Sequence, residues 1–205
     1  VTGNGVYIYD NTAPGLNDSC WAISFDGTNP GFTYESEGGY DLFSDDQGDL
    51  LVSGRFTHAI FTSRAGVSYG RTPDCGMFLA NYNSNGVLKW LVHGGETGDL
   101  TRISEVERAP DGSIYAAGFG GTTAKLHTNR GDSVTIGAGS YIFRFDSIGG
   151  LAWYCKFSNL TQVSLAMEID TAGNCYVTGT AIPTSFYSSV SGTQAIPAVA
   201  NTNFF

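Results

Sequence analysis

Three stretches of the chain share one pattern, and this pattern decides the fold. They are Gly48-Asp49-Leu50-Leu51-Val52-Ser53-Gly54, Gly112-Ser113-Ile114-Tyr115-Ala116-Ala117-Gly118 and Gly173-Asn174-Cys175-Tyr176-Val177-Thr178-Gly179. Each holds a β-prone segment between two glycines, and the starting positions 48, 112 and 173 are almost evenly spaced along the chain. Recurrence at a nearly constant interval is the sequence signature of a repeat architecture.

A polar turn precedes each stretch, as in Pro110-Asp111-Gly112. Glycine is favoured in such turns because it adopts positive φ without a Cβ clash. The second glycine of each stretch ends a strand, where neighbouring strands crowd together and leave little room for a side chain. The predicted structural positions are therefore Gly48, Gly112 and Gly173 in the turns and Gly54, Gly118 and Gly179 at the strand ends.

A second motif follows the same interval. Tyr82-Asn83-Ser84-Asn85-Gly86-Val87-Leu88-Lys89-Trp90 aligns without a gap with Phe145-Asp146-Ser147-Ile148-Gly149-Gly150-Leu151-Ala152-Trp153. Strand, polar glycine turn and strand together predict a β-hairpin. A looser copy runs from Tyr9 to Trp21. Because Trp21, Trp90 and Trp153 recur at equivalent positions, we expect them to pack between units; the alternative is an exposed aromatic platform for carbohydrate.

Each repeat unit holds four strand candidates, and no helical pattern is found. We expect the four strands of a unit to form one antiparallel sheet, and sheets repeated in series to stack radially as in a β-propeller. The chain is thus predicted to be all-β, a propeller-like array of about three four-stranded blades plus the start of a fourth. In the third unit the strand candidates are 141–145, 151–157, 163–169 and 174–180.

This organisation makes residues 1–205 part of one propeller. Three units fall short of the usual four to eight or so blades, so we expect a longer polypeptide or closure by several chains. The predicted units are 1–56, 76–120 and 139–181, with a fourth beginning near 201, and the insertions between units are 57–75, 121–138 and 182–200.

The joint pattern resembles the bacterial β-propeller repeat family known as SBBP. The third unit carries it best, in Phe145-Asp146-Ser147, Trp153 and Asp170-Thr171-Ala172-Gly173-Asn174-Cys175-Tyr176-Val177-Thr178-Gly179. The resemblance covers most of 40–205. It implies a repeat module of long secreted or cell-surface bacterial proteins, acting in adhesion, scaffolding or protein interaction, without an assigned catalytic residue.

Composition excludes several other classes. The chain has 10 basic and 19 acidic residues, a net charge of −9, which would repel a nucleic-acid backbone. Aromatic residues make up 13% and charged residues only 14%, the opposite of a disordered chain. No apolar run reaches the roughly 18 residues of a membrane-spanning helix. We therefore expect no nucleic-acid partner and no membrane span.

Residues able to carry chemistry are few. His58, His93 and His127 lie in none of the common metal or catalytic motifs, and His93 is expected in a solvated loop at a blade rim. Two glutamate pairs, Glu35 with Glu37 and Glu105 with Glu107, have the i, i+2 spacing that points both carboxylates to one face of a strand, as glycoside hydrolysis requires. A solvent-facing role is the default for them. We expect no enzyme activity and no cofactor.

Two further clusters have simpler explanations. Asp41, Asp45, Asp46 and Asp49 offer oxygen ligands to Ca²⁺, but Asp45 occupies a repeat turn, where a side-chain bond to the backbone explains it better. The integrin-type tripeptide 130–132, Arg-Gly-Asp, matches too easily by chance. No metal site is predicted.

The four cysteines form no CxxC pair. Cys155 and Cys175 fall on the second and fourth strands of one predicted unit, about 9.6 Å apart by two inter-strand spacings. That exceeds the ~7 Å limit for a disulfide, so we expect both thiols to be free. A bond between Cys20 and Cys75 stays open.

The leading hypothesis is a non-catalytic, extracellular repeat module of a secreted or cell-surface assembly. Its expected partners are other protein subunits or further blades of the same polypeptide. The alternatives are a carbohydrate-binding propeller, which would contact surface glycans through rim aromatics such as Tyr69 or Tyr187, and a structural protein of a phage or virion appendage.

Overall fold

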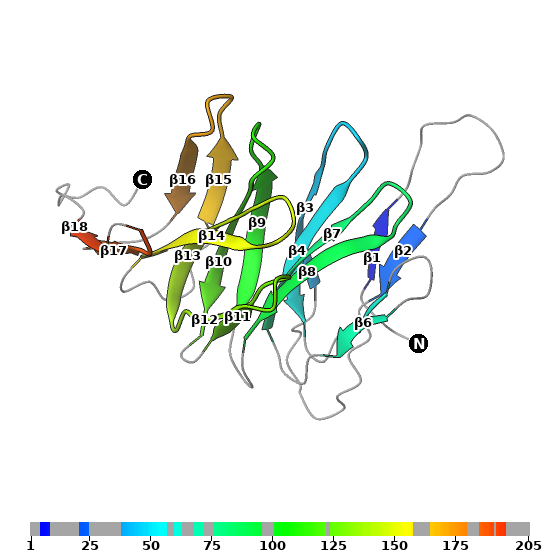
Figure 1. Cartoon of the computed structure of the whole chain (residues 1–205), viewed down its shortest axis with the longest axis horizontal. Coiled ribbons are helices and arrows are strands. Elements are labelled where there is room, and N and C mark those ends of the chain that lie inside the picture. The colour runs from blue at the N-terminus through cyan, green and yellow to red at the C-terminus, as the bar shows by residue number, and fades with distance from the viewer. Residues whose placement is uncertain are drawn as a thin grey trace.

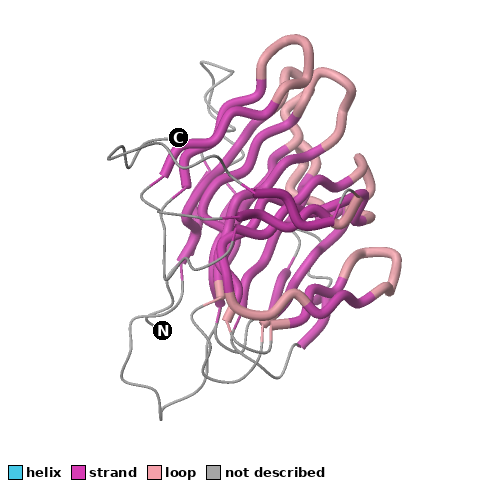
Figure 2. The backbone as a smooth tube through the Cα atoms, turned by 90° about the vertical axis from the view of Figure 1, so that its left-hand side faces the viewer, coloured by secondary structure: helices cyan, strands magenta, loops and turns pink. Residues whose placement is uncertain are grey.

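The computed structural model is built of β-strands, and no helix is found in the part of the chain that it describes (Figure 2). The all-β prediction is confirmed. The structure describes residues 5–8, 21–24, 38–56, 60–62, 68–71, 76–95, 101–121, 124–157, 165–179, 185–190 and 192–195.

Two large antiparallel sheets make up most of the molecule. Sheet 1 has the order β12-β11-β8-β7-β4-β3, with β3 (Gly38–Ser44), β4 (Leu50–Phe56), β7 (Gly76–Tyr82), β8 (Leu88–Gly94), β11 (Lys125–His127) and β12 (Ser133–Thr135). Sheet 2 has the order β18-β17-β14-β13-β10-β9, with β9 (Arg102–Arg108), β10 (Ile114–Gly120), β13 (Gly139–Phe145), β14 (Leu151–Phe157), β17 (Ser185–Ser188) and β18 (Gly192–Ala195).

Three hairpins form two-stranded sheets. They are β1 (Gly5–Ile8) with β2 (Trp21–Ser24), β5 (Ile60–Thr62) with β6 (Ser68–Arg71), and β15 (Leu165–Ile169) with β16 (Cys175–Gly179), the last called sheet 3 below. In Figure 1 the sheets follow one another across the molecule from the N-terminal to the C-terminal side.

The chain passes back and forth between neighbouring sheets. All four strands expected in the third unit exist, within two residues at each end, but β13 and β14 belong to sheet 2 whereas β15 and β16 form sheet 3. The expectation that they form one sheet was wrong. The hairpin β13–β14 pairs instead with the hairpin before it, because β10 and β13 form a continuous seven-residue register from Ile114↔Phe145 to Gly120↔Gly139.

The predicted insertions carry strands of their own. Within 121–138, β11 pairs with β8 and so extends sheet 1, and within 182–200, β17 pairs with β14 and extends sheet 2. Sheets 1 and 2 are therefore six-stranded rather than four-stranded. β12 (Ser133–Thr135) pairs in turn with β11.

Apolar side chains fill the space between successive sheets. One cluster joins Leu51 and Met77 of sheet 1 to Ile103 and Phe143 of sheet 2, and another joins Tyr115 of sheet 2 to sheet 3. Because both faces of a middle sheet are covered, β4 and β10 are buried at consecutive residues instead of alternating. The core thus lies between the sheets.

Four turns between strands are built alike, each around the side chain of an Asp or Asn. Asp45 Oδ1 accepts hydrogen bonds from the backbone N–H groups of Gln47 and Asp49, at 3.0 and 2.9 Å, which confirms the turn role predicted for Asp45. Asn83, Asp146 and Asp170 make equivalent bonds. The fourth residue of each of these turns is a glycine with φ between +74° and +83°: Gly48, Gly86, Gly149 and Gly173. Gly112 and Gly131, with φ +82° and +84°, hold the same place in the turns that begin at Ala109 and Thr128.

Two of the three strand-end glycines, Gly54 and Gly118, lie opposite β-bulges, whereas Gly179 pairs with Leu165 in a regular register. Tyr40 on β3 and Ser104 on β9 are the extra residues of two register shifts, facing Gly54 and Gly118 respectively. A Cβ on Gly118 would lie 2.3 Å from the carbonyl oxygen of Arg102. The bulge brings the edge strand against the glycine, so only glycine fits there.

Candidate functional site: the inner strand edges

The edge strands β3, β9 and β15 approach one another although they belong to three different sheets. β9 lies against β3 on one side and β15 on the other. Each is the terminal strand of its sheet, so part of its backbone has no strand partner. This inner edge, defined here as β3, β9 and β15, is where the three sheets meet.

Carboxylates bridge these edges. Asp41 Oδ2 on β3 accepts a 2.7 Å hydrogen bond from the backbone N–H of Val106 on β9. Glu107 Oε2 on β9 accepts a 2.7 Å bond from the N–H of Ile169 on β15. Each bond gives a backbone N–H on an edge strand a carboxylate oxygen as acceptor, and hydrogen bonds to carboxylates are among the stronger ones in proteins. The inner edge is thus joined by polar contacts as well as by apolar packing.

Acidic side chains on β3, β9 and β15 lie close enough to one another to raise the pKa of two glutamates on β9. Partial burial, the charge of Asp41 and the charge of Glu107 raise the pKa of Glu105. The pKa of Glu107 is also raised, first by burial and then by Glu168 and Asp41, against the lowering effect of its bond to Ile169. Both carboxyl groups therefore hold a proton to higher pH than an ordinary glutamate.

The predicted glutamate pair lies on β9 in partly buried positions, not on an open solvent face. One member, Glu107, is engaged by the Ile169 backbone, which a free general acid or nucleophile would not be. Glu35 and Glu37 lie outside the described residues. The structure therefore gives Glu107 a bridging role between β9 and β15.

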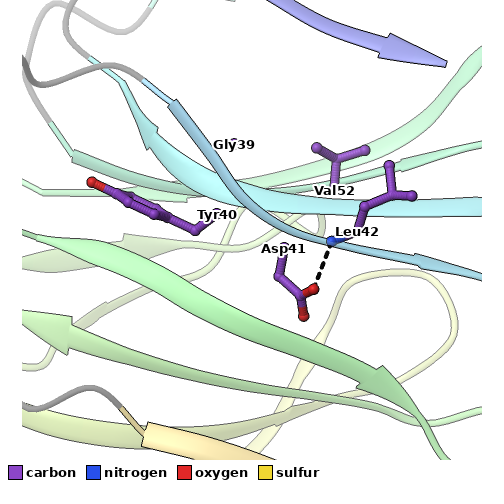
Figure 3. Close-up of a pocket in the computed structure, with 5 residues that line it drawn as sticks. All are labelled: Gly39, Tyr40, Asp41, Leu42 and Val52. Carbon is purple, nitrogen blue, oxygen red and sulfur yellow. Dashed lines mark hydrogen bonds between the residues drawn. The ribbon is translucent and has the colours of Figure 1, made fainter.

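A cavity of about 320 Å³ opens beside β3, lined by Gly39, Tyr40, Asp41, Leu42 and Val52 (Figure 3). Leu42 and Val52 point to one side of the ribbon, and the Asp41 carboxylate points to the other. Tyr40 and Leu42 are 49% and 44% exposed. An exposed aromatic ring near exposed apolar side chains is a surface able to bind a ligand.

Histidines lie at a strand pair rather than in a loop. His93 on β8 is directly opposite His127 on β11, and their rings stack with centroids 5.0 Å apart. The expectation of a solvated loop for His93 was wrong, because β11 extends the sheet over this strand. Burial, followed by the charge of His127, lowers the pKa of His93 to about 4. His58 lies outside the described residues.

The tryptophans differ in their surroundings. Trp90 is 4% exposed, packs between sheets 1 and 2, and donates a 3.0 Å hydrogen bond from Nε1 to the Ser147 carbonyl in the next turn. Trp153 is only partly buried and meets the Tyr115 ring edge-on at 5.9 Å. Trp21 begins β2.

The candidate calcium ligands are dispersed among other contacts. Asp45 serves its turn, Asp49 pairs with Lys89 Nζ at 2.6 Å, and Asp41 bridges to Val106. Within the described ranges no group of three or more possible metal ligands is found. In the 130–132 tripeptide, Arg130 is paired with Asp146 of the neighbouring sheet, which explains its presence structurally.

Cys155 and Cys175 are both free, as predicted. The reason differs from the expected one, because β14 and β16 belong to different sheets and the two thiols lie in the apolar layer between them. Burial raises the pKa of both thiols to about 11. Cys20 and Cys75 lie outside the described residues, as do the side chains of Tyr69 and Trp21.

The bridging role of Asp41 was missed from the sequence. Asp41 was considered only as a candidate calcium ligand, although its place inside a β-prone segment, where a lone acidic residue is disfavoured, was a usable signal. The β-bulge at Tyr40, which faces Gly54 of β4, is not indicated by any pattern in the sequence.

Comparison with known proteins adds no relative: no protein family, curated protein or solved structure matches the chain. The described residues contain no helix of the length and apolarity needed to cross a membrane.

Proposed function

We propose that the chain is a propeller-like, non-catalytic repeat module whose blades present a surface to other proteins. One observation carries the proposal: successive sheets stack face to face, and each contributes an edge strand to a common inner edge. Four-stranded antiparallel sheets packed around a shared inner edge are the plan of a propeller. The hairpins β11–β12 and β17–β18 then lengthen two blades at their outer edges.

The non-catalytic part of the proposal rests on how the acidic side chains are used. Glu107 and Asp41 are committed to backbone N–H groups of the next strand. These bonds join neighbouring sheets, so both side chains have a structural role. The expected test is a hydrolase screen on aryl glycosides, esters and peptides, in which the chain and its Glu105→Gln variant show the same background rate. A rate that falls in Glu105→Gln contradicts the proposal.

The setting we propose is the outer surface of a bacterial cell or a secreted assembly, in line with the SBBP resemblance. Protease treatment of intact producing cells tests it: the chain should be cleaved while a cytoplasmic marker survives. Recovery of the chain in purified virus-like particles instead would favour the appendage alternative.

A second candidate is carbohydrate binding at the cavity beside β3. The half-exposed Tyr40 ring at this cavity favours it, because sugars stack on exposed aromatic rings. A glycan array tests this directly. Tyr40→Ala should abolish any signal, and Tyr187→Ala, which removes a 41% exposed tyrosine elsewhere, should not.

A further inference from the structure

Two histidine rings face each other where the outer hairpin β11–β12 joins sheet 1. His93 on β8 and His127 on β11 are direct partners in the antiparallel register, so their side chains lie on the same face of the sheet. The ring centroids are 5.0 Å apart, with an angle of 22° between the ring planes. Both residues are partly buried. The pair therefore occupies a sheltered position that solvent still reaches.

The ring nitrogens of this pair take no part in the hydrogen bonding of the protein. In the part of the chain that the structure describes, the contact between the rings is the interaction found for His93 and His127, and neither ring has a hydrogen-bond partner. The residue opposite His93 on β7 is Phe78, whose side chain has no polar atom. Sheltered polar atoms normally have a partner, so these unpaired nitrogens require an explanation, and a bound ligand supplies one.

The chemistry of the pair limits the kind of ligand. Two imidazolium charges at this separation repel each other, so the uncharged form of the pair is favoured. A neutral imidazole has a lone pair on one ring nitrogen and is the form that binds metal ions. Imidazole nitrogen suits Zn²⁺, Cu²⁺ and Ni²⁺, whereas Ca²⁺ and Mg²⁺ take oxygen ligands. The ligand that fits is thus a divalent transition-metal ion.

We propose that His93 and His127 together bind one Zn²⁺ or a chemically similar ion, with water in the remaining coordination positions. Two imidazoles bound to one tetrahedral ion at about 2.0–2.1 Å per nitrogen have centroids roughly 5 Å apart, which is the separation observed. The Cβ–Cγ bond points at the ring centre, so rotation about χ2 aims one nitrogen of each ring at the shared ion and leaves the centroid separation almost unchanged. This torsion is broad in histidine, so the rotation costs little.

The ion would lie at a short junction between strands. β11 and β8 are joined by two residue pairs, whereas β7 and β8 are joined by six. An ion held by one residue from each strand cross-links β11 to β8 at this junction and so fastens the hairpin β11–β12 to sheet 1. The inference goes beyond the proposed function and does not depend on it, because β8 and β11 belong to the same sheet.

Zn²⁺ titration of the chain, after removal of bound metal with a chelator, tests the site directly. Calorimetry should show one ion bound per chain, and the Tm should rise with free Zn²⁺, because an ion that binds only the folded state stabilises it by mass action. In ¹H–¹⁵N spectra the ring nitrogens of His93 and His127 should shift, and those of His58, the remaining histidine, should not. Mg²⁺ at the same concentration should produce none of these effects.

Two variants and a matched control assign the ligands. His93→Gln and His127→Gln should each weaken Zn²⁺ binding by at least about 10-fold, the loss that mutation of a residue merely supporting a metal ligand commonly causes. His58→Gln should bind Zn²⁺ as the wild type does. If either variant unfolds, as circular dichroism would show, the ring-nitrogen shifts of the wild type decide. A wild-type chain that does not bind Zn²⁺, ring nitrogens of His93 and His127 that do not shift, or a folded His93→Gln/His127→Gln variant that binds as tightly as the wild type each overturns the proposal.

Discussion

Asp41 on β3 and Val106 on β9 are joined across two sheets by a 2.7 Å hydrogen bond from the Val106 N–H to the Asp41 carboxylate. The bond satisfies a backbone donor at the edge of sheet 2, where Val106 itself is 1% exposed. Because water has little access to this N–H, the Asp41 carboxylate takes the place of water as its hydrogen-bond acceptor.

Asp41→Ala should therefore lower the free energy of unfolding by about 1–3 kcal/mol, the cost of a buried donor left without an acceptor. Asp41→Asn keeps an acceptor oxygen and should cost much less. Urea denaturation of the two variants measures the difference. Equal losses in both would show that the bond to Val106 contributes nothing.

Glu105→Gln should change the pH dependence of stability. Because the folded-state pKa of Glu105 is raised, the folded protein binds the proton more tightly than the unfolded chain, so this group disfavours folding as pH rises above the ordinary glutamate value of about 4.3. Glu105→Gln removes that penalty. Its Tm should exceed the wild-type value at pH 7 and match it near pH 4; a lower Tm at pH 7 contradicts the prediction.

His93→Gln should act in the opposite direction. The pKa of His93 is lowered to about 4 in the folded protein against about 6.5 when unfolded. The unfolded chain therefore gains a proton first, and wild-type stability is lost as pH falls from about 6.5 towards 4. The variant should lose less Tm between pH 7.5 and 5. His127→Gln, which removes only the smaller cause, serves as the control and should retain most of the loss.

Gly118→Ala tests the bulge. The added Cβ would lie 2.3 Å from the Arg102 carbonyl oxygen, so the strands must separate, and we expect a cost near 3 kcal/mol, the upper end of overpacking. Gly112 has φ +82° but open space around it. Gly112→Asn should be nearly neutral, because asparagine tolerates this conformation. Thermal unfolding compares the two, and similar losses would rule out the steric explanation.

The thiols of Cys155 and Cys175 should react slowly in the native state. With a pKa of about 11, only about 0.1% of each is thiolate at pH 8, against about a quarter for an ordinary thiol. Alkylation should therefore be at least about 100-fold slower than in urea, as peptide mass spectrometry can follow. Equal native and denatured rates at these two positions would mean that the apolar layer between β14 and β16 is open.

Local chemistry made much of the fold predictable. The turn at Asp45 and the glycines at 48, 112 and 173 could be assigned because the conformations they favour are decided within a few residues. Strand limits were predicted closely in the third unit for the same reason. The bulge at Tyr40 and the carboxylate bridge at Asp41 could not be assigned, since both depend on strands that are distant in the sequence.

The sequence by itself determined that the chain is all-β, that its glycine-bounded motifs recur at a nearly constant interval, and where the turns of those motifs lie. Only the tertiary structure decided which hairpins share a sheet, with β13 joining β10 rather than β15, and which edges meet. The physical reason is that a repeat fixes the interval between hairpins but not where a sheet begins. Backbone hydrogen bonds between strands carry no residue identity, so the choice of partner is made by packing across the whole series of sheets.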